Sequence, residues 1–156
     1  MSVYLDKHSG EKVKPLKFQK NDGGRSEAGF KGLAGDCTTR AIAIVTGKSY
    51  REVYNALNSL AKEGRQTKHK KRSSARDGVH RTIYDKYLKS LGYEWTATMK
   101  IGTGCKVHLR EGELPNGRLI VRVSKHMTSV VDGVIHDTHD PSRGGVRCVY
   151  GYWSKK

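Results

Sequence analysis

The sequence predicts an α+β domain in which the helices come first and antiparallel strands follow. Up to about residue 90, apolar residues recur with the period of a helix, and after that point apolar and polar residues alternate. The pair Asp132-Gly133, flanked by Val131 and Val134, is a strong signal for a two-residue β-hairpin turn. Helical segments that precede strand segments along the chain are typical of the α+β class.

Three helices are expected, over residues 38–45, 49–62 and 78–90. The first has Asp36 as a suitable N-cap and Gly47 as a suitable C-terminal cap. Its interior is apolar on every face, which indicates a helix buried all round. Ser49 and Glu52 form a capping box for the second helix, and Asp77 is placed to cap the third. The residues expected to face inward in the last two helices are Val53, Leu57, Leu60, Val79, Ile83, Tyr87, Leu88 and Leu91.

Five strands are expected after the helices, over residues 94–98, 119–124, 127–131, 134–138 and 146–153. Residues 1–34 are rich in Lys and Gly, and we interpret them as an irregular basic leader that packs on the domain without a regular element of its own. Residues 35–156 form the domain itself. Within it, residues 65–76 carry six Lys or Arg and no acidic residue, which predicts an exposed basic loop.

The composition limits the class of protein. The 156 residues carry a formal net charge of +15, and such a surplus favours polyanionic partners. No stretch has the apolar length of a membrane span and the N-terminal residues do not resemble a signal peptide, so no membrane partner is expected. The three cysteines, Cys37, Cys105 and Cys148, are an odd number at wide spacings. This pattern favours free thiols in a reducing compartment, and we therefore expect a cytoplasmic location.

Cys37 is the first candidate for chemistry. It follows Asp36 in the first turn of a predicted helix, where unpaired amide donors and the positive end of the helix dipole stabilise a thiolate. A catalytic cysteine needs this stabilisation, because the thiolate is the nucleophile. The alternative is a buried cysteine that packs as a small hydrophobic residue.

The predicted hairpin places a carboxylate beside an imidazole. A two-residue turn at 132–133 puts Thr128 opposite Asp137, and His126 lies on the same face as Thr128 because strand side chains alternate. Asp137 is then a diagonal neighbour of His126 and lies within side-chain reach. A carboxylate in this position can hold the imidazole in one tautomer and stabilise its cation.

Two alternatives to this pair stay open. The residues can be a surface histidine and a turn aspartate in a polar hairpin. A shift of the register by a few residues would instead bring His139 or Asp140 to the position of Asp137.

These motifs resemble those of the papain-like cysteine peptidases. Residues 35–41, Gly-Asp-Cys-Thr-Thr-Arg-Ala, are similar to the Asp-Cys helix start of that superfamily, and residues 126–137 are similar to its order of His, apolar strand, Gly turn, strand and Asp. The arrangement resembles the C39-like bacteriocin-processing peptidases and the NlpC/P60 endopeptidases, and the chain also resembles small uncharacterised proteins of bacteria and phages. The resemblance implies a papain-like fold, no cofactor, and a triad with Cys37 as nucleophile, His126 as base and Asp137 orienting the base.

The sequence departs from this family at the oxyanion site. Papain-like enzymes commonly place a Gln about six residues before the cysteine to help bind the oxyanion, and that position here is Lys31. Gln19 and Asn21 are the candidates to replace it, beside the backbone amide of Cys37. Thr38 and Thr39 also stand where those families have a small Gly or Ser pair.

Two other segments contain residues suited to chemistry. Residues 136–140, His-Asp-Thr-His-Asp, could form a metal cluster with Cys148 nearby. Strand alternation points His136 away from Asp137 and His139, which splits the ligands, so no metal is expected. Cys105 follows a Gly-Thr-Gly turn and is expected to be a semi-exposed spectator thiol.

The sequence therefore predicts a cysteine-dependent amide-bond hydrolase, either a peptidase or an isopeptidase, that acts on a peptide or protein through a thioester. A transglutaminase or acyltransferase would use the same triad. The alternative is a non-catalytic basic binding protein on a papain-like scaffold, which engages nucleic acid or an acidic protein weakly and without sequence preference. Its expected binding residues, all in the basic loop, are Lys68, Lys70, Lys71 and Arg72.

Overall fold

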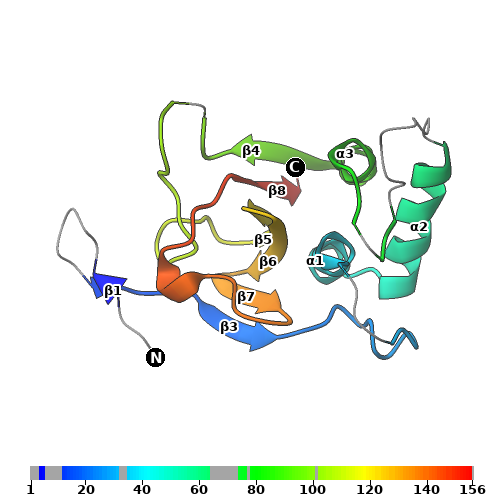
Figure 1. Ribbon diagram of the computed structural model, residues 1–156, viewed down its shortest axis with the longest axis horizontal. Coiled ribbons are helices and arrows are strands. Elements are labelled where there is room, and N and C mark those ends of the chain that lie inside the picture. Colours follow the sequence, from blue (N-terminus) through cyan, green and yellow to red (C-terminus); the bar gives the residue numbers. More distant parts are fainter. Residues whose placement is uncertain are drawn as a thin grey trace.

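The computed structural model describes residues 4–5, 12–31, 35–63, 74–76, 78–100 and 102–155. Within these ranges it confirms the α+β class (Figure 1). The helices are α1 (Cys37–Thr46), α2 (Tyr50–Glu63) and α3 (Arg81–Ser90). The main sheet consists of β3 (Lys17–Lys20), β4 (Tyr93–Ala97), β5 (Arg118–Val123), β6 (His126–Val131), β7 (Val134–Asp137) and β8 (Gly151–Lys155). A separate two-stranded ribbon pairs β1 (Tyr4–Leu5) with β2 (Lys12–Val13).

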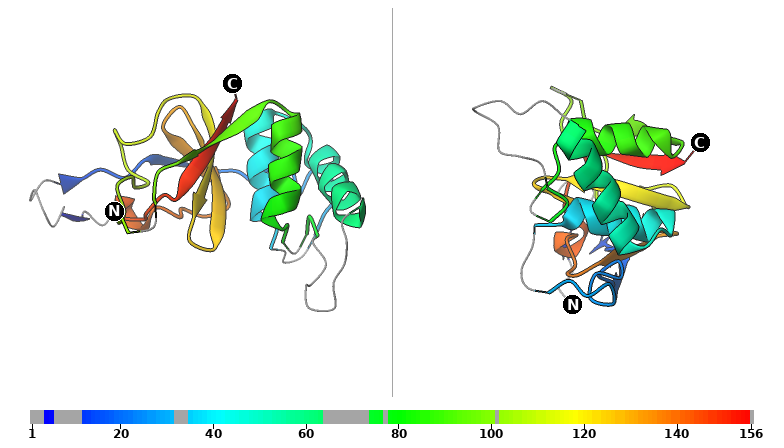
Figure 2. Two further views of the ribbon diagram at one scale, coloured as in Figure 1. Left: turned by 90° about the horizontal axis from the view of Figure 1, so that it is seen from above. Right: turned by 90° about the vertical axis from the view of Figure 1, so that its right-hand side faces the viewer.

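The helices form a layer on one side of the sheet (Figures 1 and 2). The strand order is β3-β7-β6-β5-β8-β4, with β3 parallel to β7 and the other pairs antiparallel. Helix α1 packs against β5, β6 and β7, and α2 lies on its far side. Residues 41–45 of α1 are all buried, which confirms the prediction of a helix enclosed on every face.

The predicted cap at the end of the first helix is confirmed, and the predicted capping box at the start of the second is confirmed in part. Gly47 has a φ of 76° and donates its N–H to the Ala43 oxygen, as a left-handed C-terminal cap does. The Ser49 Oγ accepts the Glu52 N–H at 3.2 Å, which is half of the expected capping box. Helix α3 begins at Arg81, later than predicted, and Asp77 lies outside the described residues.

The predicted hairpin is also confirmed. Strands β6 and β7 pair with Val131 opposite Val134 and Ser129 opposite His136. The turn residues Asp132 and Gly133 have φ angles of 47° and 79°, as a two-residue type I′ turn requires. With this register, the side chains of β6 and β7 point to the faces of the sheet that the sequence predicted.

The last strand is shorter than predicted. It begins at Gly151, and residues 143–145 form a short 3-10 turn. The alternation over residues 146–150 has a different cause. Val149 is buried and donates its backbone N–H to the Val107 oxygen, so the chain pairs with a loop there, whereas Tyr150 already donates its N–H to the Arg122 oxygen of β5.

The interpretation of residues 1–34 as an irregular leader is wrong in one respect. The leader does pack on the domain, but it contains β1 and β2, which pair with each other, and β3, which runs parallel to β7 from Lys17 opposite Val134 to Lys20 opposite Asp137. All four residues of β3 are exposed. Side chains without a buried face leave no alternation of apolar and polar residues to detect, and an exposed edge strand with Lys is common.

The predicted basic loop lies mostly outside the described residues. Lys68, Lys70, Lys71 and Arg72 are among those outside, and their role stays a prediction. In the described end of the segment, residues 74–76, Arg76 is exposed as predicted but Ala75 is not. Ala75 is 1% exposed, its N–H donates to the Asn58 Oδ1 at 2.9 Å, and its carbonyl accepts the Thr39 hydroxyl at 2.7 Å.

The prediction of three free thiols is wrong. Cys105 and Cys148 form a disulfide across a sequence separation of 43 residues, and Cys37 remains free. Cys105 is therefore not the expected spectator thiol. The backbone bridge between His108 and Cys148 brings the two loops together, a long-range pairing that cysteine spacing does not reveal. Among the described residues, no helix has the length and apolar character needed to cross a membrane.

Thiol titration and unfolding test this disulfide. The unfolded, unreduced protein is expected to show one reactive thiol with a chromogenic disulfide reagent, and three after reduction. Opening a loop of this size increases the entropy of the unfolded chain, so replacing Cys105 and Cys148 with Ser should lower the free energy of unfolding by about 2–4 kcal/mol. Urea denaturation measures this loss. Three thiols without reductant would contradict the disulfide.

Candidate active site

Cys37 is the first residue of α1 and is half-buried. Asp36 occupies the predicted N-cap position, but its carboxylate makes no capping hydrogen bond. The carboxylate is instead buried and accepts the Tyr50 hydroxyl at 2.6 Å. The sequence therefore identified the position of Asp36 but not its partners.

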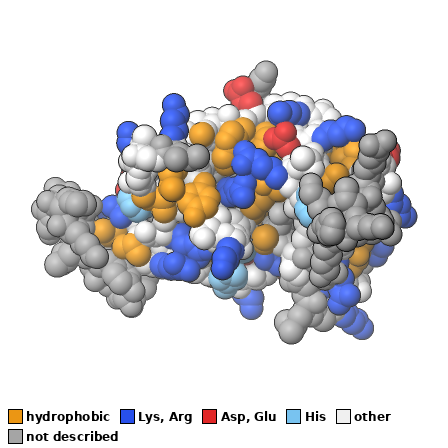
Figure 3. All heavy atoms as spheres, turned by 45° about the horizontal axis from the view of Figure 1, so that its top comes forward, with side chains coloured by type: hydrophobic (Ala, Val, Ile, Leu, Met, Phe, Trp, Pro, Cys, Tyr) orange, Lys and Arg blue, Asp and Glu red, His pale blue; other side chains and the backbone are white. Residues whose placement is uncertain are grey.

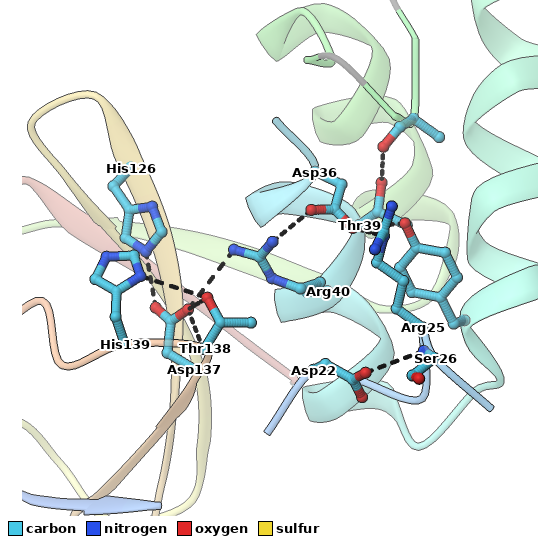
Figure 4. Close-up of polar contacts among 12 residues, drawn as sticks. Asp22, Arg25, Ser26, Asp36, Thr39, Arg40, His126, Asp137, Thr138 and His139 are labelled. Atoms are coloured by element: carbon cyan, nitrogen blue, oxygen red, sulfur yellow. Dashed lines mark hydrogen bonds and ion pairs between the residues drawn. The ribbon is translucent and has the colours of Figure 1, made fainter. Parts of the chain in front are cut away.

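His126 and Asp137 meet as the hairpin register predicts (Figure 4). His126 is the first residue of β6, Asp137 is the last of β7, and the distance between Nε2 and Oδ2 is 2.7 Å. The other carboxylate oxygen of Asp137 accepts the Thr138 N–H at 2.7 Å. Asp137 is 3% exposed, so this carboxylate holds the imidazole in an environment largely screened from water.

The electrostatics of Cys37 favour a thiolate. Burial raises the pKa of the thiol, but a hydrogen bond from His126 and one from the Met127 backbone N–H lower it. The positive charges of His126 and Arg40 lower it further, and the net pKa of Cys37 is below its ordinary value. The thiolate is the reactive form in cysteine enzymes, and a lowered pKa increases the fraction of the cysteine that is thiolate.

The imidazole shows the complementary change. Burial alone would lower the pKa of His126, but hydrogen bonds and charges from Asp137 and Cys37 raise it to about 9. Burial likewise raises the pKa of Asp137, and the hydrogen bond and charge of His126 outweigh it, so that the net pKa is lowered. The directions of the three pKa shifts favour a thiolate, an imidazolium and a carboxylate in one cluster, and the three groups titrate as a coupled system.

Arg40 belongs to the same cluster and was not predicted. It lies one turn after Cys37 on α1 and pairs with Asp36 on one side and, at 3.7 Å, with the Asp137 Oδ1 on the other (Figure 4). Arg25 also pairs with Asp36, at 3.3 Å. The position of Arg40 one helical turn after Asp36 was visible in the sequence, but its contact with β7 depends on how α1 packs on the sheet.

Cys37 and His126 line one pocket of about 560 Å³ between the start of α1 and the ends of β5 and β6. The other residues that line it are Gly35, Asp36, Thr38, Arg40, Gly78, Val79, Tyr84, Arg122, Val123, Lys125, Met127 and His139. Its three Lys and Arg side chains, Arg40, Arg122 and Lys125, come from α1, β5 and the turn between β5 and β6, whereas its one acidic residue, Asp36, is buried and ion-paired. The pocket therefore presents a positive surface.

Neither predicted oxyanion side chain lies in this pocket. Gln19 is exposed on β3, where its amide donates to the Lys20 carbonyl. The Asn21 amide nitrogen lies 3.3 Å from the His136 Nδ1, on the opposite face of β7 from Asp137. These two expectations are wrong, because β3 joins the sheet beyond β7. The Cys37 backbone amide remains a candidate donor.

The geometry distinguishes Asp137 from Asp140 and His139, the two residues that a shifted hairpin register would place beside His126. Asp140 accepts the backbone N–H of Ser142 in a local turn at 2.9 Å and does not bond to His126. The His139 ring lies beside the His126 ring, with 5.1 Å between the centroids. Among the described residues, no group of three or more His, Cys, Asp or Glu is arranged to hold a metal ion.

Comparisons of the chain with protein-family models, with curated proteins and with solved structures found no match. The fold and the site therefore define its class: an α+β protein with a Cys-His-Asp cluster beside a positively charged pocket.

Proposed function

We propose that the protein is a cysteine-dependent amide-bond hydrolase of papain-like type, in which Cys37, His126 and Asp137 form the catalytic triad. The single observation that supports this most is the 2.7 Å hydrogen bond between His126 and Asp137 beside a helix-start cysteine of lowered pKa. Cysteine chemistry needs these three features together: a stabilised thiolate, a proton donor next to it and a group that orients the donor.

The proposed reaction has two stages. The Cys37 thiolate attacks the carbonyl carbon of an amide, and His126 gives its proton to the nitrogen as the C–N bond breaks, which releases an amine and leaves a thioester on Cys37. Neutral His126 then takes a proton from water as the water oxygen attacks the thioester. The C–S bond breaks, a carboxylic acid leaves, and the ion pair of thiolate and imidazolium is restored. An amine in place of water would give a transferase.

The disulfide bears on where this chemistry takes place. The expected cytoplasmic location rested on three free thiols, and two of the three form a disulfide. Because disulfides persist mainly in oxidising compartments, the pairing weighs against the cytoplasm. The location stays a proposal, and the thiol count of the unreduced protein bears directly on it.

A basic binding protein on the same scaffold is the second candidate. The observation that favours it is the absence of the predicted oxyanion side chains, Gln19 and Asn21, from the pocket that contains Cys37. The net charge of +15 is compatible with either function.

Selective alkylation tests the proposed hydrolase. With the disulfide reduced, iodoacetamide at roughly pH 6 should modify Cys37 at least ten times faster than Cys105 and Cys148, because a normal thiol is almost fully protonated there. Replacing His126 with Ala should remove this preference, since the hydrogen bond that stabilises the thiolate is lost. Mass spectrometry of the modified peptides measures each rate. Equal rates at the three cysteines in the wild-type protein would contradict a catalytic thiolate and favour the binding protein.

A further inference from the structure

A second pocket of about 340 Å³ lies next to the candidate active site. It is lined by Arg81, Trp95, Ala97, Met99, Lys100, Arg122 and Tyr150. Arg122 of β5 lines both pockets, so the two are neighbours on one surface. The two stages of the proposed reaction make no use of this second pocket.

The strand register gives the distance between Met127, which lines the first pocket, and Ala97, which lines the second. Across the sheet, Met127 of the first pocket is opposite Arg122, Arg122 is opposite Gly151, and Gly151 is opposite Ala97 of the second pocket. These four residues lie on adjacent strands β6, β5, β8 and β4. Adjacent strands are about 4.8 Å apart, so the row spans about 14 Å. An extended peptide covers this distance in about four residues at roughly 3.3 Å per residue.

The second pocket combines positive charge with a fixed aromatic wall. Its lining includes three cations, Arg81, Lys100 and Arg122, and no carboxylate. No ion pair to a carboxylate is found for these three within the described part of the chain. Figure 3, in which the side that carries β4 and α3 is turned forward, shows Lys and Arg side chains among hydrophobic ones and few acidic ones.

Trp95 holds this wall in place. The Arg81 guanidinium lies over the Trp95 ring, 4.9 Å from its centroid. On the neighbouring strand, a Cβ at Gly151 would lie 2.3 Å from the indole of Trp95, so only glycine leaves room for the ring there. The indole is therefore packed onto the sheet, and the cation stacked on it is pre-positioned for a planar anion.

We propose that the second pocket binds an acidic side chain of a peptide substrate about four residues away from the scissile amide. This inference rests on the proposed function and names its substrate class, a peptide with Glu or Asp at that spacing. Arg81 and Arg122 would bind the carboxylate, and Met99 and Tyr150 would contact its apolar stem. Arg guanidinium groups bind carboxylates with two parallel hydrogen bonds, which provides selectivity for a carboxylate over a neutral amide.

A peptide fits these observations better than a nucleic acid. Single-stranded nucleic acids bind through exposed aromatic faces on which bases stack. Arg81 already covers one face of the Trp95 ring. Trp153 also packs near this ring, with 5.4 Å between the centroids of the two tryptophan rings. The pocket thus offers cations for a carboxylate but no open indole face of this kind for a base.

Binding to a Cys37→Ala variant tests the proposal without turnover. Two fluorescein-labelled ten-residue peptides, identical except that one has two Glu where the other has two Gln, are compared by fluorescence anisotropy at low and high salt. The acidic peptide should bind at least tenfold more tightly at low salt. Adding Arg81→Gln should remove most of this preference, whereas Lys86→Gln, an exposed cation on the same helix, should leave it unchanged.

The outcomes separate this inference from the proposed function. Equal affinity for the two peptides, or a preference that survives Arg81→Gln, would overturn the acidic-peptide inference even if Cys37 proves to be a catalytic thiolate. Tighter binding of a labelled single-stranded oligonucleotide, lost on Arg81→Gln, would overturn it in favour of nucleic acid. An acidic preference in a protein whose Cys37 is unreactive would support the pocket and reject the hydrolase.

Discussion

Replacing Asp137 with Asn is expected to lower the rate of amide hydrolysis at neutral pH by about two orders of magnitude, and replacing Cys37 with Ala to abolish it. An amide at position 137 can still bond to the His126 Nε2, but it carries no charge to stabilise the imidazolium. Cleavage of a diverse peptide mixture, followed by mass spectrometry of the new termini, measures the loss without requiring a defined substrate.

The pH dependence gives a second measurement of the same variant. His126 has a pKa of about 9, and it must be protonated to give its proton to the leaving amine. Wild-type hydrolysis should therefore fall as the pH rises through about 9. Asp137 is one of the groups that raises this pKa, so in the Asp137→Asn variant the decline should begin at a lower pH. Alkylation of Cys37 should show no such decline, because it requires the thiolate alone.

Asp140→Asn is the matched control. Asp140 is three residues further along the chain, and its carboxylate bonds to the Ser142 backbone instead of His126. Its replacement should leave both the rate and the pH profile unchanged. A large loss at Asp140 with little effect at Asp137 would mean that the orienting carboxylate has been assigned to the wrong residue.

The pairing of His126 with Asp137 could be predicted because it depends on local information. A two-residue Asp-Gly turn sets the register of the hairpin, and the register decides which side chains share a face. The end of α1 was predictable for a similar reason, since the Gly47 cap is encoded within a few residues of the helix end. The two residues of the proposed triad that lie on the hairpin, His126 and Asp137, could thus be predicted from the sequence.

The remaining features depend on contacts between distant segments. β3 has no buried face, so its pairing with β7 leaves no periodic pattern in the sequence. The disulfide between Cys105 and Cys148 follows from a backbone bridge between two loops, and cysteine spacing alone favoured free thiols. The role of Arg40 depends on the packing of α1 against the end of β7. Each of these contacts is decided by tertiary packing, which local patterns do not specify.

Replacing Arg40 with Met is expected to lower the free energy of unfolding by about 3 kcal/mol or more. The Asp36 side chain is 1% exposed and that of Arg40 is 12% exposed, so their ion pair is largely shielded from water. Among the described residues, removing the cation leaves a buried carboxylate with Arg25 and the Tyr50 hydroxyl as its remaining side-chain partners. Urea denaturation measures the loss. The surface pair Lys48 and Glu52 is the control, and Lys48→Met should change the stability by about 0.5 kcal/mol or less.

The same variant should also weaken the thiolate. The charge of Arg40 is one of the causes that lower the pKa of Cys37, so the pH at which alkylation of Cys37 is half-maximal should rise in Arg40→Met. A double variant, Asp36→Asn with Arg40→Met, removes the buried charge together with its partner and should recover much of the lost stability. It should not restore the alkylation profile, because the guanidinium is still absent. If the double variant is as unstable as the sum of the two single variants, Asp36 and Arg40 are not energetically coupled, and the loss in Arg40→Met does not come from their ion pair.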